Sequence, residues 1–238
     1  MVSLKRLYFG LIQKAKKVSL SNIINNINVL MFHDIYLGDS VFSPLDISSN
    51  NFVYFFQELL ERKVCFCKID SIFIPNDATK YTITFDDVHE SVYSNAIPFL
   101  IKHSIPFTLF IANAFINQNG YLTSRQILEL TNNPLCTIGF HSNSHVIMRG
   151  LDKTSIKKEI DCSELMHEYS VDCDYFAYPY GSIYACSNQV IKTVKDSGRY
   201  KAAFGTINCS TNYKTITKEP FYIPRLTVSD QTWKNIIN

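Results

Sequence analysis

The sequence predicts a single α/β domain built on a parallel sheet or barrel. Short apolar, β-prone runs alternate with helical patterns along the chain, and several runs are apolar on both faces, as strands covered on both sides must be. Hydrophobic residues make up 46% of the 238 residues and charged residues 18%, which is enough apolar material for a buried core and excludes general disorder. No linker rich in Gly, Ser or Pro divides the chain, so we predict one domain over residues 28–238.

Seven runs are expected to form the strands of this domain. They are rich in Val, Ile, Phe, Tyr and Thr, the residues that pack well on a pleated surface. The runs lie at residues 29–32, 64–69, 81–85, 107–111, 137–140, 175–178 and 202–204.

Helical patterns fill the intervals between several of these runs. Thr123 and Gln126 have the spacing of a capping box, and Gly198 is a typical stop after the last pattern. Each pattern follows residues that can cap a helix N-terminus: 52–60 after Ser49 and Asn50, 127–130 after Thr123, 156–166 after Asp152, and 190–194 after Ser187.

Residues 1–17 carry a concentration of positive charge. Lys5, Arg6, Lys14, Lys16 and Lys17 lie there with no acid, among leucines at helical spacing. The pattern allows a peripheral contact with an anionic membrane surface, or a helix that caps the domain with its basic face in solvent; we favour the second. We therefore set residues 1–27 apart as a basic amphipathic N-terminal segment.

Composition also indicates the cellular compartment and excludes some classes of partner. No apolar stretch approaches the roughly 20 residues of a membrane span, and the run at 7–12 is too short for a secretory signal, so we expect a cytoplasmic protein, at most peripheral at the inner membrane face.

Seven cysteines without a CxxC pair favour free thiols over a disulfide framework or a structural zinc module. A net charge of +2 and basic residues without an aromatic platform disfavour nucleic-acid binding. The sequence leaves the oligomeric state open.

Chemically capable side chains come directly after the predicted strands. Because the carboxyl ends of parallel strands form one rim, residues far apart in the sequence are expected to converge there. The candidates are His33 after 29–32, Asp86 and Asp87 after 81–85, His141 after 137–140, and Tyr180 after 175–178.

Two of these groups have the chemistry of a metal site. Asp86 and Asp87 point in different directions, so that one can bind a cation while the other stays free as a base; alternatively the pair caps a helix. His141 and His145 are four residues apart, so both can reach one metal from a single helical turn. Two imidazoles and one carboxylate form a catalytic type of ligand set, which leaves a position open for water.

His33 and Tyr180 each allow two interpretations. His33 is either an active group or a strand-end histidine satisfied by backbone atoms. The Tyr180-Gly181 turn either bares backbone N–H groups that stabilise an oxyanion or is an ordinary tight turn.

Together these motifs resemble the polysaccharide deacetylase superfamily, also called the NodB-homology domain or family 4 carbohydrate esterases. Residues 84–87 match the TFDD motif of that family, 141–145 match its H-S/T-x-x-H motif, and 176–181 resemble its proline-tyrosine-glycine segment. The resemblance extends from about Val29 to Val228 and implies an irregular (β/α) barrel, usually with seven parallel strands.

The resemblance also implies roles for these residues. Asp87, His141 and His145 would hold a divalent metal, commonly zinc, and Asp86 would be the general base that takes a proton from water. The Tyr180 backbone N–H would help to stabilise the oxyanion. The implied activity is the removal of an N-acetyl group from an acetamido sugar of a polysaccharide or glycan intermediate, with release of acetate.

The chain departs from the common family pattern at its third and later motifs. Ala177 or Tyr178 occupies the place of an arginine that orients the base, and no histidine follows His167 to serve as the C-terminal acid. Val88 replaces a glycine that is common after the two aspartates, which puts the local turn in question.

One branch of the family offers an explanation for the missing acid. In proteins similar to biofilm poly-N-acetylglucosamine deacetylases the acid histidine comes from an N-terminal strand, which His33 would match, and Arg225 would then contact substrate. The alternatives are a catalytically impaired carbohydrate-binding protein on the same scaffold, or an amidase or deformylase acting on a non-acetyl substrate.

Overall fold

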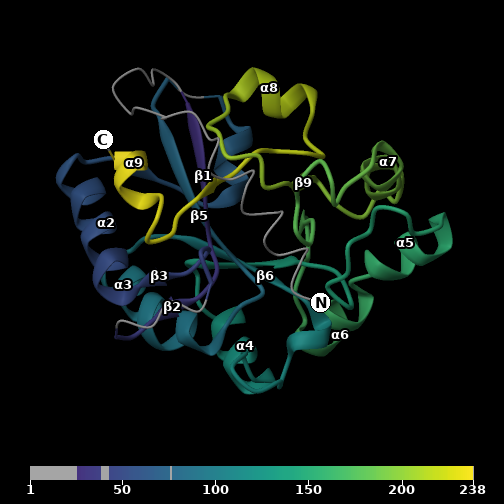
Figure 1. Cartoon of the computed structure of the whole chain (residues 1–238), viewed down its shortest axis with the longest axis horizontal. Helices are drawn as coiled ribbons and strands as arrows, with labels where there is room; N and C mark the ends of the chain where they lie inside the picture. The colour runs from purple at the N-terminus through teal and green to yellow at the C-terminus, as the bar shows by residue number, and fades with distance from the viewer. Residues whose placement is uncertain (1–25, 39–42, 76, 238) are drawn as a thin grey trace.

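A curved sheet of parallel strands forms the centre of the fold in the computed structural model, which describes residues 26–38, 43–75 and 77–237 (Figure 1). Two short strands, β2 (Ile35–Tyr36) and β3 (Ile47–Ser48), form a separate small sheet. The strands of the main sheet are β1 (Ile27–Phe32), β4 (Cys65–Phe66), β5 (Lys80–Asp86), β6 (Phe107–Ile111), β7 (Cys136–Phe140), β8 (Tyr175–Ala177), β9 (Ala202–Phe204) and β10 (Leu226–Thr227).

Every pairing in the main sheet is parallel. Seven strands follow one another in the order β10-β1-β5-β6-β7-β8-β9, and β4 pairs with the start of β5. The sheet curls into an irregular half-barrel (Figure 1). The predicted α/β fold, an irregular (β/α) barrel with seven parallel strands, is therefore confirmed.

One C-terminal segment, residues 223–227, connects the two edges of the curled sheet. The Ile223 N–H donates to the carbonyl of Ala203 at 2.9 Å, next to β9, whereas Leu226 pairs with Leu30 of β1. The segment thus contacts both β9 and β1, and Arg225 lies between these two contacts. The sequence pattern did not reveal β10, because a strand of two residues is too short to show a periodicity.

The strand register aligns the chemically capable residues at one rim. Phe32 at the end of β1 lies opposite Phe85 of β5, and Phe140 at the end of β7 lies opposite Ile111 at the end of β6. The residues that directly follow these strands therefore emerge at the same edge of the sheet, as the sequence predicts.

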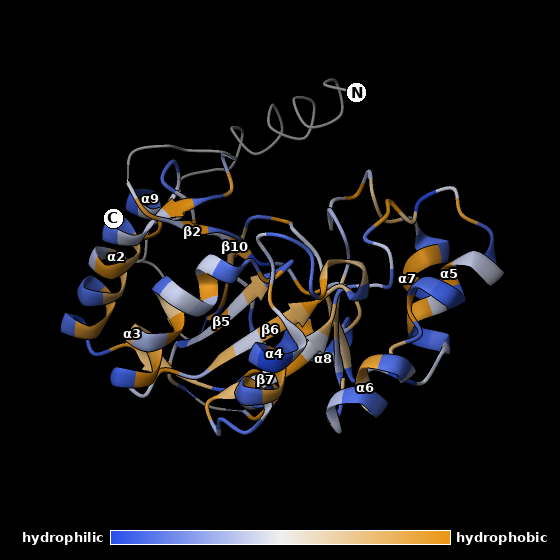
Figure 2. Ribbon diagram, turned by 90° about the horizontal axis from the view of Figure 1, so that it is seen from below, coloured by the Kyte–Doolittle hydropathy of each residue, from blue (hydrophilic) through white to orange (hydrophobic). Residues whose placement is uncertain are grey.

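Helices cover the outside of the sheet, and Figure 2 shows mostly hydrophobic strands at the centre and helices that carry both hydrophilic and hydrophobic residues. Thr123 and Gln126 form the predicted capping box, and Asp152 and Ser187 cap the helices that follow them, whereas Ser48 rather than Ser49 caps α2. The helices are α2 (Ser49–Glu61), α3 (Ile97–Lys102), α4 (Ser124–Thr131), α5 (Lys153–Glu159), α6 (Ser163–Tyr169), α7 (Asn188–Asp196), α8 (Tyr213–Lys218) and α9 (Trp233–Ile237), with 3-10 turns at Ile69–Phe73 and Asn113–Phe115 and a π-helical turn at Val92–Ala96.

Two predictions about local elements differ from the structure. The pattern predicted at 156–166 is divided between α5 and α6, because the chain breaks the helix at Ile160–Cys162. The run predicted at 64–69 contributes only the two residues of β4, since Cys65 is exposed and the chain passes into a 3-10 turn at Ile69.

The N-terminal prediction falls almost wholly outside the described residues. Of the proposed segment 1–27, the structure describes only residues 26 and 27, and β1 already begins at Ile27. In the part of the chain that is described, no helix combines the length and the apolar character needed to cross a membrane.

Strand β1 is buried on both faces, in agreement with the sequence pattern. Leu30 and Phe32 belong to the larger apolar cluster under the helices, and Ile27 and Val29 to a second cluster on the other face of the sheet. In the larger cluster the Phe32 ring packs against four aromatic rings, those of Phe52, Phe55, Phe56 and Phe85, at centroid distances of 5.4 to 6.1 Å. This packing fixes the end of β1 directly before His33.

Replacing Phe32 by alanine should remove the ring at the centre of this cluster. Loss of a fully buried aromatic side chain costs about 3–5 kcal/mol of unfolding free energy. Urea unfolding of F32A would measure the loss, and Y54A is the matched control, since Tyr54 lies on α2 but is 60% exposed. A change in F32A no larger than that in Y54A would contradict the packing described here.

Candidate active site

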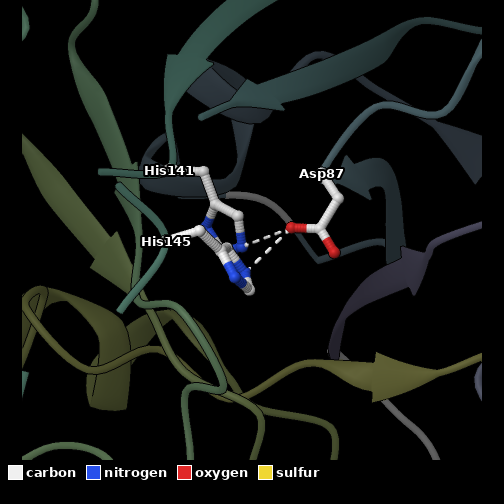
Figure 3. A group of neighbouring side chains, drawn as sticks. All are labelled: Asp87, His141 and His145. Carbon is white, nitrogen blue, oxygen red and sulfur yellow. Dashed lines mark ion pairs between the residues drawn. The ribbon is translucent and has the colours of Figure 1, made fainter. Parts of the chain in front are cut away.

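The first group of the site is a triad of side chains that converge from two loops of the rim. Asp87 follows β5, and His141 and His145 follow β7 (Figure 3). Asp87 Oδ1 lies 3.3 Å from His141 Nε2 and 2.9 Å from His145 Nε2, and one potential ligand atom of each residue lies within 4.8 Å of the others. Such a group has the donor atoms and the spacing to hold a metal ion.

The hydrogen bond of His141 to the backbone determines which ring nitrogen faces the triad. Its Nδ1 lies 2.8 Å from the carbonyl of Ala177, which can only accept, so Nδ1 carries a proton. In the neutral ring Nε2 is then an acceptor, and it faces a second acceptor, Asp87 Oδ1, at 3.3 Å. Two buried acceptors at this distance repel unless a proton or a cation lies between them. The geometry therefore fits a cation at this position.

The loop that carries the two histidines is not the helical turn that the spacing predicts. Ser142 and His145 both have left-handed backbone conformations, with φ of 72° and 51°, and the His145 N–H donates to Ser142 Oγ at 3.0 Å. A tight irregular loop, rather than one face of a helix, brings the two imidazoles to a centroid distance of 5.0 Å.

The carboxylates and imidazoles of the site change one another's pKa values. Burial alone would raise the pKa of Asp87, but hydrogen bonds and charge from His141 and His145 hold it well below its usual value. Burial alone would lower the pKa of His141, but the carboxylates of Asp86 and Asp87 raise it. In the absence of a metal ion, Asp87 is therefore ionised and protonation of the His141 ring is favoured.

The second group of the site is an ion pair between Asp86 and Arg225. Both guanidinium Nη atoms donate to the carboxylate at 2.6 Å, and Arg225 also donates to the Gly205 carbonyl and the Thr84 hydroxyl. The pair is buried, with exposures of 1% for Asp86 and 0% for Arg225. Burial raises the pKa of Asp86, but Arg225 and His141 bring it below its usual value, so the carboxylate is ionised.

The placement of Arg225 corrects the prediction that it contacts substrate. Its side chain is fully buried, and its donors bind Asp86, Gly205 and Thr84. Arg225 instead contacts Asp86. In the common family pattern an arginine near positions 177–178 orients this aspartate, and this chain has none there. The sequence did hold one signal for this pair. Arg225 is the single charged residue in an apolar C-terminal segment, and a buried arginine requires an acidic partner.

His33 lies among the charged groups of the site. Burial has the largest effect and leaves the pKa of its ring below the usual value; Asp86 and Asp87 raise that pKa, and Arg225 and His141 lower it further. Its Nδ1 is buried without a hydrogen-bond partner among the described residues. That nitrogen is not satisfied by the backbone, which removes the purely structural interpretation that the sequence left open for His33.

Tyr180 borders the triad on the side of β8. Its ring lies 5.0 Å from the ring of His145, it is 37% exposed, and its backbone is left-handed with φ of 59°. The turn continues through Gly181, where an added Cβ would come within 2.6 Å of Thr206 Cγ2. The structure therefore places a partly exposed Tyr180 next to His145, a member of the triad.

Comparison with known proteins connects this geometry to a family. Residues 74–200 match the sequence model of the family described as polysaccharide deacetylase. The poly-beta-1,6-N-acetyl-D-glucosamine N-deacetylase of Staphylococcus aureus (strain MSSA476) is 27% identical over 173 residues, which cover 65% of this chain and 56% of that protein. The Staphylococcus epidermidis protein of the same name is 28% identical over 172 residues. The chain thus spans about half the length of these curated relatives.

Solved structures agree on the fold. IcaB from Ammonifex degensii has a TM-score of 0.73 at 22% identity, covering 89% of this chain and 95% of that chain. The Streptococcus pyogenes deacetylase PplD, solved in complex with acetate, has a TM-score of 0.76 at 17% identity, covering 90% of this chain and 97% of that chain. At these identities the likeness establishes a shared fold.

Replacing Arg225 by methionine should leave Asp86 buried without its partner. Breaking a buried ion pair in this way costs about 3–5 kcal/mol of unfolding free energy. Because Asp86 has a lowered pKa in the folded state, the pair stabilises the protein above the ordinary carboxyl pKa of about 4. That stability is lost as the pH falls through the lowered value, so the difference between R225M and wild type should shrink in acid.

Urea unfolding at neutral and acidic pH measures both effects. The exposed pair of Lys192 and Asp196 provides the matched control, and K192M should change the unfolding free energy by less than about 0.5 kcal/mol. An R225M protein as stable as K192M at neutral pH would refute the assignment of this ion pair.

Proposed function

The chain belongs to the polysaccharide deacetylase family, and we propose that it is a metal-dependent N-deacetylase. It hydrolyses the acetamide of an N-acetylated sugar in a polysaccharide or glycan intermediate and releases acetate. The observation that supports this most directly is the convergence of Asp87, His141 and His145 beside a second, ionised carboxylate, Asp86. The names of the curated relatives support poly-β-1,6-N-acetylglucosamine as the substrate class to test first.

Asp87, His141 and His145 are the residues that would hold the metal. Two imidazole nitrogens and one carboxylate oxygen suit zinc, and three protein ligands leave room for water and substrate. When bound, the ion would lower the pKa of water and polarise the acetamide carbonyl. The hydrogen bond from His141 Nδ1 to Ala177 keeps Nε2 available as a ligand.

Asp86 is the proposed general base. Its carboxylate lies 3.9 Å from His141 Nε2, so it is next to the triad without belonging to it. Arg225 keeps Asp86 ionised and fixes its orientation through two hydrogen bonds. The base can therefore accept a proton from the attacking water without first having to turn or to lose a proton of its own.

His33 is the proposed general acid, and Tyr180 is the proposed oxyanion and substrate contact. Burial lowers the pKa of His33, although Asp86 and Asp87 oppose the shift, so a protonated ring there gives its proton readily to the departing amine. The backbone N–H of Tyr180 would donate to the carbonyl oxygen as negative charge develops on it. One proton thus goes from water to Asp86, and one goes from His33 to the amine.

The alternative of an impaired carbohydrate-binding protein loses its main support. It was motivated by the missing arginine before Pro179 and the missing C-terminal histidine. Arg225 pairs with Asp86 from another segment, and His33 lies among the charged groups of the site. An amidase or deformylase with another acyl group is separated from an N-deacetylase by identifying the acid that is released. Cytoplasmic location, and the membrane contact through residues 1–17, remain predictions from composition.

Acetate release should depend on the two aspartates in different ways. Wild type loaded with zinc should release acetate from oligomers of β-1,6-linked N-acetylglucosamine. In D86N the turnover number kcat should fall about 10²–10⁴-fold while the metal is retained, because Asp86 is the proposed base and not a metal ligand. D86N should also be less stable than wild type, because Arg225 loses its charged partner. In D87A both metal content and activity should be lost, because a ligand is removed.

Enzymatic acetate assay and elemental analysis of the purified variants measure these outcomes. D196N, far from the site in sequence and on the surface, should match wild type in both. Metal-loaded wild type that releases acetate from none of the acetylated glycans offered would refute the proposed activity.

Replacing His33 by glutamine should remove the acid without removing the metal. We expect kcat to fall about 10²–10⁴-fold at unchanged metal content. A general acid must be protonated, so the wild-type rate should decline as the pH rises through the pKa of His33, and this decline should be absent in H33Q. A pH–rate profile of kcat tests both points, and an H33Q profile that coincides with wild type would exclude His33 as the acid.

A further inference from the structure

The loop between β6 and α4 carries a tyrosine that the proposed mechanism does not use. Tyr121 pairs with His89 in an antiparallel bridge, and the next residue, Leu122, donates its N–H to the Val88 carbonyl at 3.3 Å. These contacts fasten Tyr121 to the turn that follows Asp87. The tyrosine is therefore positioned by the same backbone that positions one member of the triad.

Stacked rings restrict the orientation of the Tyr121 side chain. The His89 ring lies at a centroid distance of 4.6 Å and an angle of 28°, and the Phe115 ring at 4.5 Å and 20°. Phe115 in turn lies 5.1 Å from the ring of His145. Because its ring is stacked on two neighbours that are themselves fixed next to the triad, Tyr121 has little freedom to turn. The group that it can offer to a ligand is its hydroxyl.

The pKa of the Tyr121 hydroxyl is raised by burial and by charged residues of the site. Burial is the largest effect that raises its pKa, followed by the charges of Asp87 and Asp34. Tyr180, on the other side of His145, also has its pKa raised by burial and by Asp87. Both tyrosines are therefore neutral at neutral pH, and the charge of Asp87 acts on the pKa of each. Tyr121 is half-buried, and within the described residues its hydroxyl has no hydrogen-bond partner.

We infer that Tyr121 is a substrate-binding residue whose hydroxyl forms a hydrogen bond with a hydroxyl group of the sugar that carries the acetamide. The inference rests on the proposed function and extends it, because it assigns a contact to the sugar ring rather than to the acetyl group. Tyr121 and Tyr180 would then flank the sugar from two loops, the first after β6 and the second after β8. A rigid neutral donor is well suited to this task, since it orients a polar substrate at little cost in side-chain entropy.

The Y121F variant tests the inference, because it removes the hydroxyl and keeps the stacked ring. With β-1,6-linked N-acetylglucosamine oligomers as substrate, KM should rise about 3- to 10-fold, the range expected for one hydrogen bond between neutral groups. The turnover number should change less than KM, and metal content and thermal unfolding should match wild type. Y54F, which removes a hydroxyl from an exposed tyrosine on α2, should leave KM unchanged.

The outcomes separate this inference from the function on which it rests. Metal-loaded wild type that releases no acetate overturns the proposed function, and the substrate contact with it. An active wild type together with a Y121F variant of unchanged KM overturns the substrate contact alone. A Y121F variant that loses metal or unfolds at lower temperature would show a structural role for the hydroxyl and would also overturn the contact.

Discussion

The buried ion pair between Asp86 and Arg225 is the interaction on which the rest of the site depends. It joins the end of β5 to the segment 223–227, which itself contacts both edges of the curled sheet. Two charges inside the fold are tolerable only because the guanidinium and the carboxylate meet in a bidentate geometry and the remaining donors reach Gly205 and Thr84. The contact that fixes the carboxylate therefore also ties this segment to the end of β5.

This pair also explains how two adjacent aspartates can do different work. Arg225 holds the carboxylate of Asp86 through two hydrogen bonds, whereas the carboxylate of Asp87 contacts the imidazoles of His141 and His145. Successive residues at a strand end point in different directions, and Asp87 turns away further through its left-handed backbone. One carboxylate is therefore directed into a cluster of donors suited to a cation, and the other is held ionised beside it. Tyr180 contacts the same cluster from the turn after β8, and His33 follows β1, where both carboxylates act on the pKa of its ring.

Much of this arrangement could be predicted from the sequence because it is encoded locally. Runs that are apolar on both faces indicate buried parallel strands, and polar residues directly after them indicate the rim, which led to Asp86, Asp87, His33 and His141. The partner of Asp86 could not be found in this way, because Arg225 is separated from it by more than half of the chain. The loop of His145 was also mispredicted, since its left-handed residues are not glycines, and Tyr121 gave no signal because its contacts form only in the fold.

The most direct test of the account is X-ray diffraction from crystals of the zinc-loaded protein, with anomalous data collected on both sides of the zinc absorption edge. The account predicts a single anomalous peak at the rim, bonded to Asp87, His141 and His145, with Asp86 still hydrogen-bonded to Arg225 and not to the ion. A peak bonded to Asp86 in place of Asp87, or no peak at these three residues in protein that carries zinc, would contradict it.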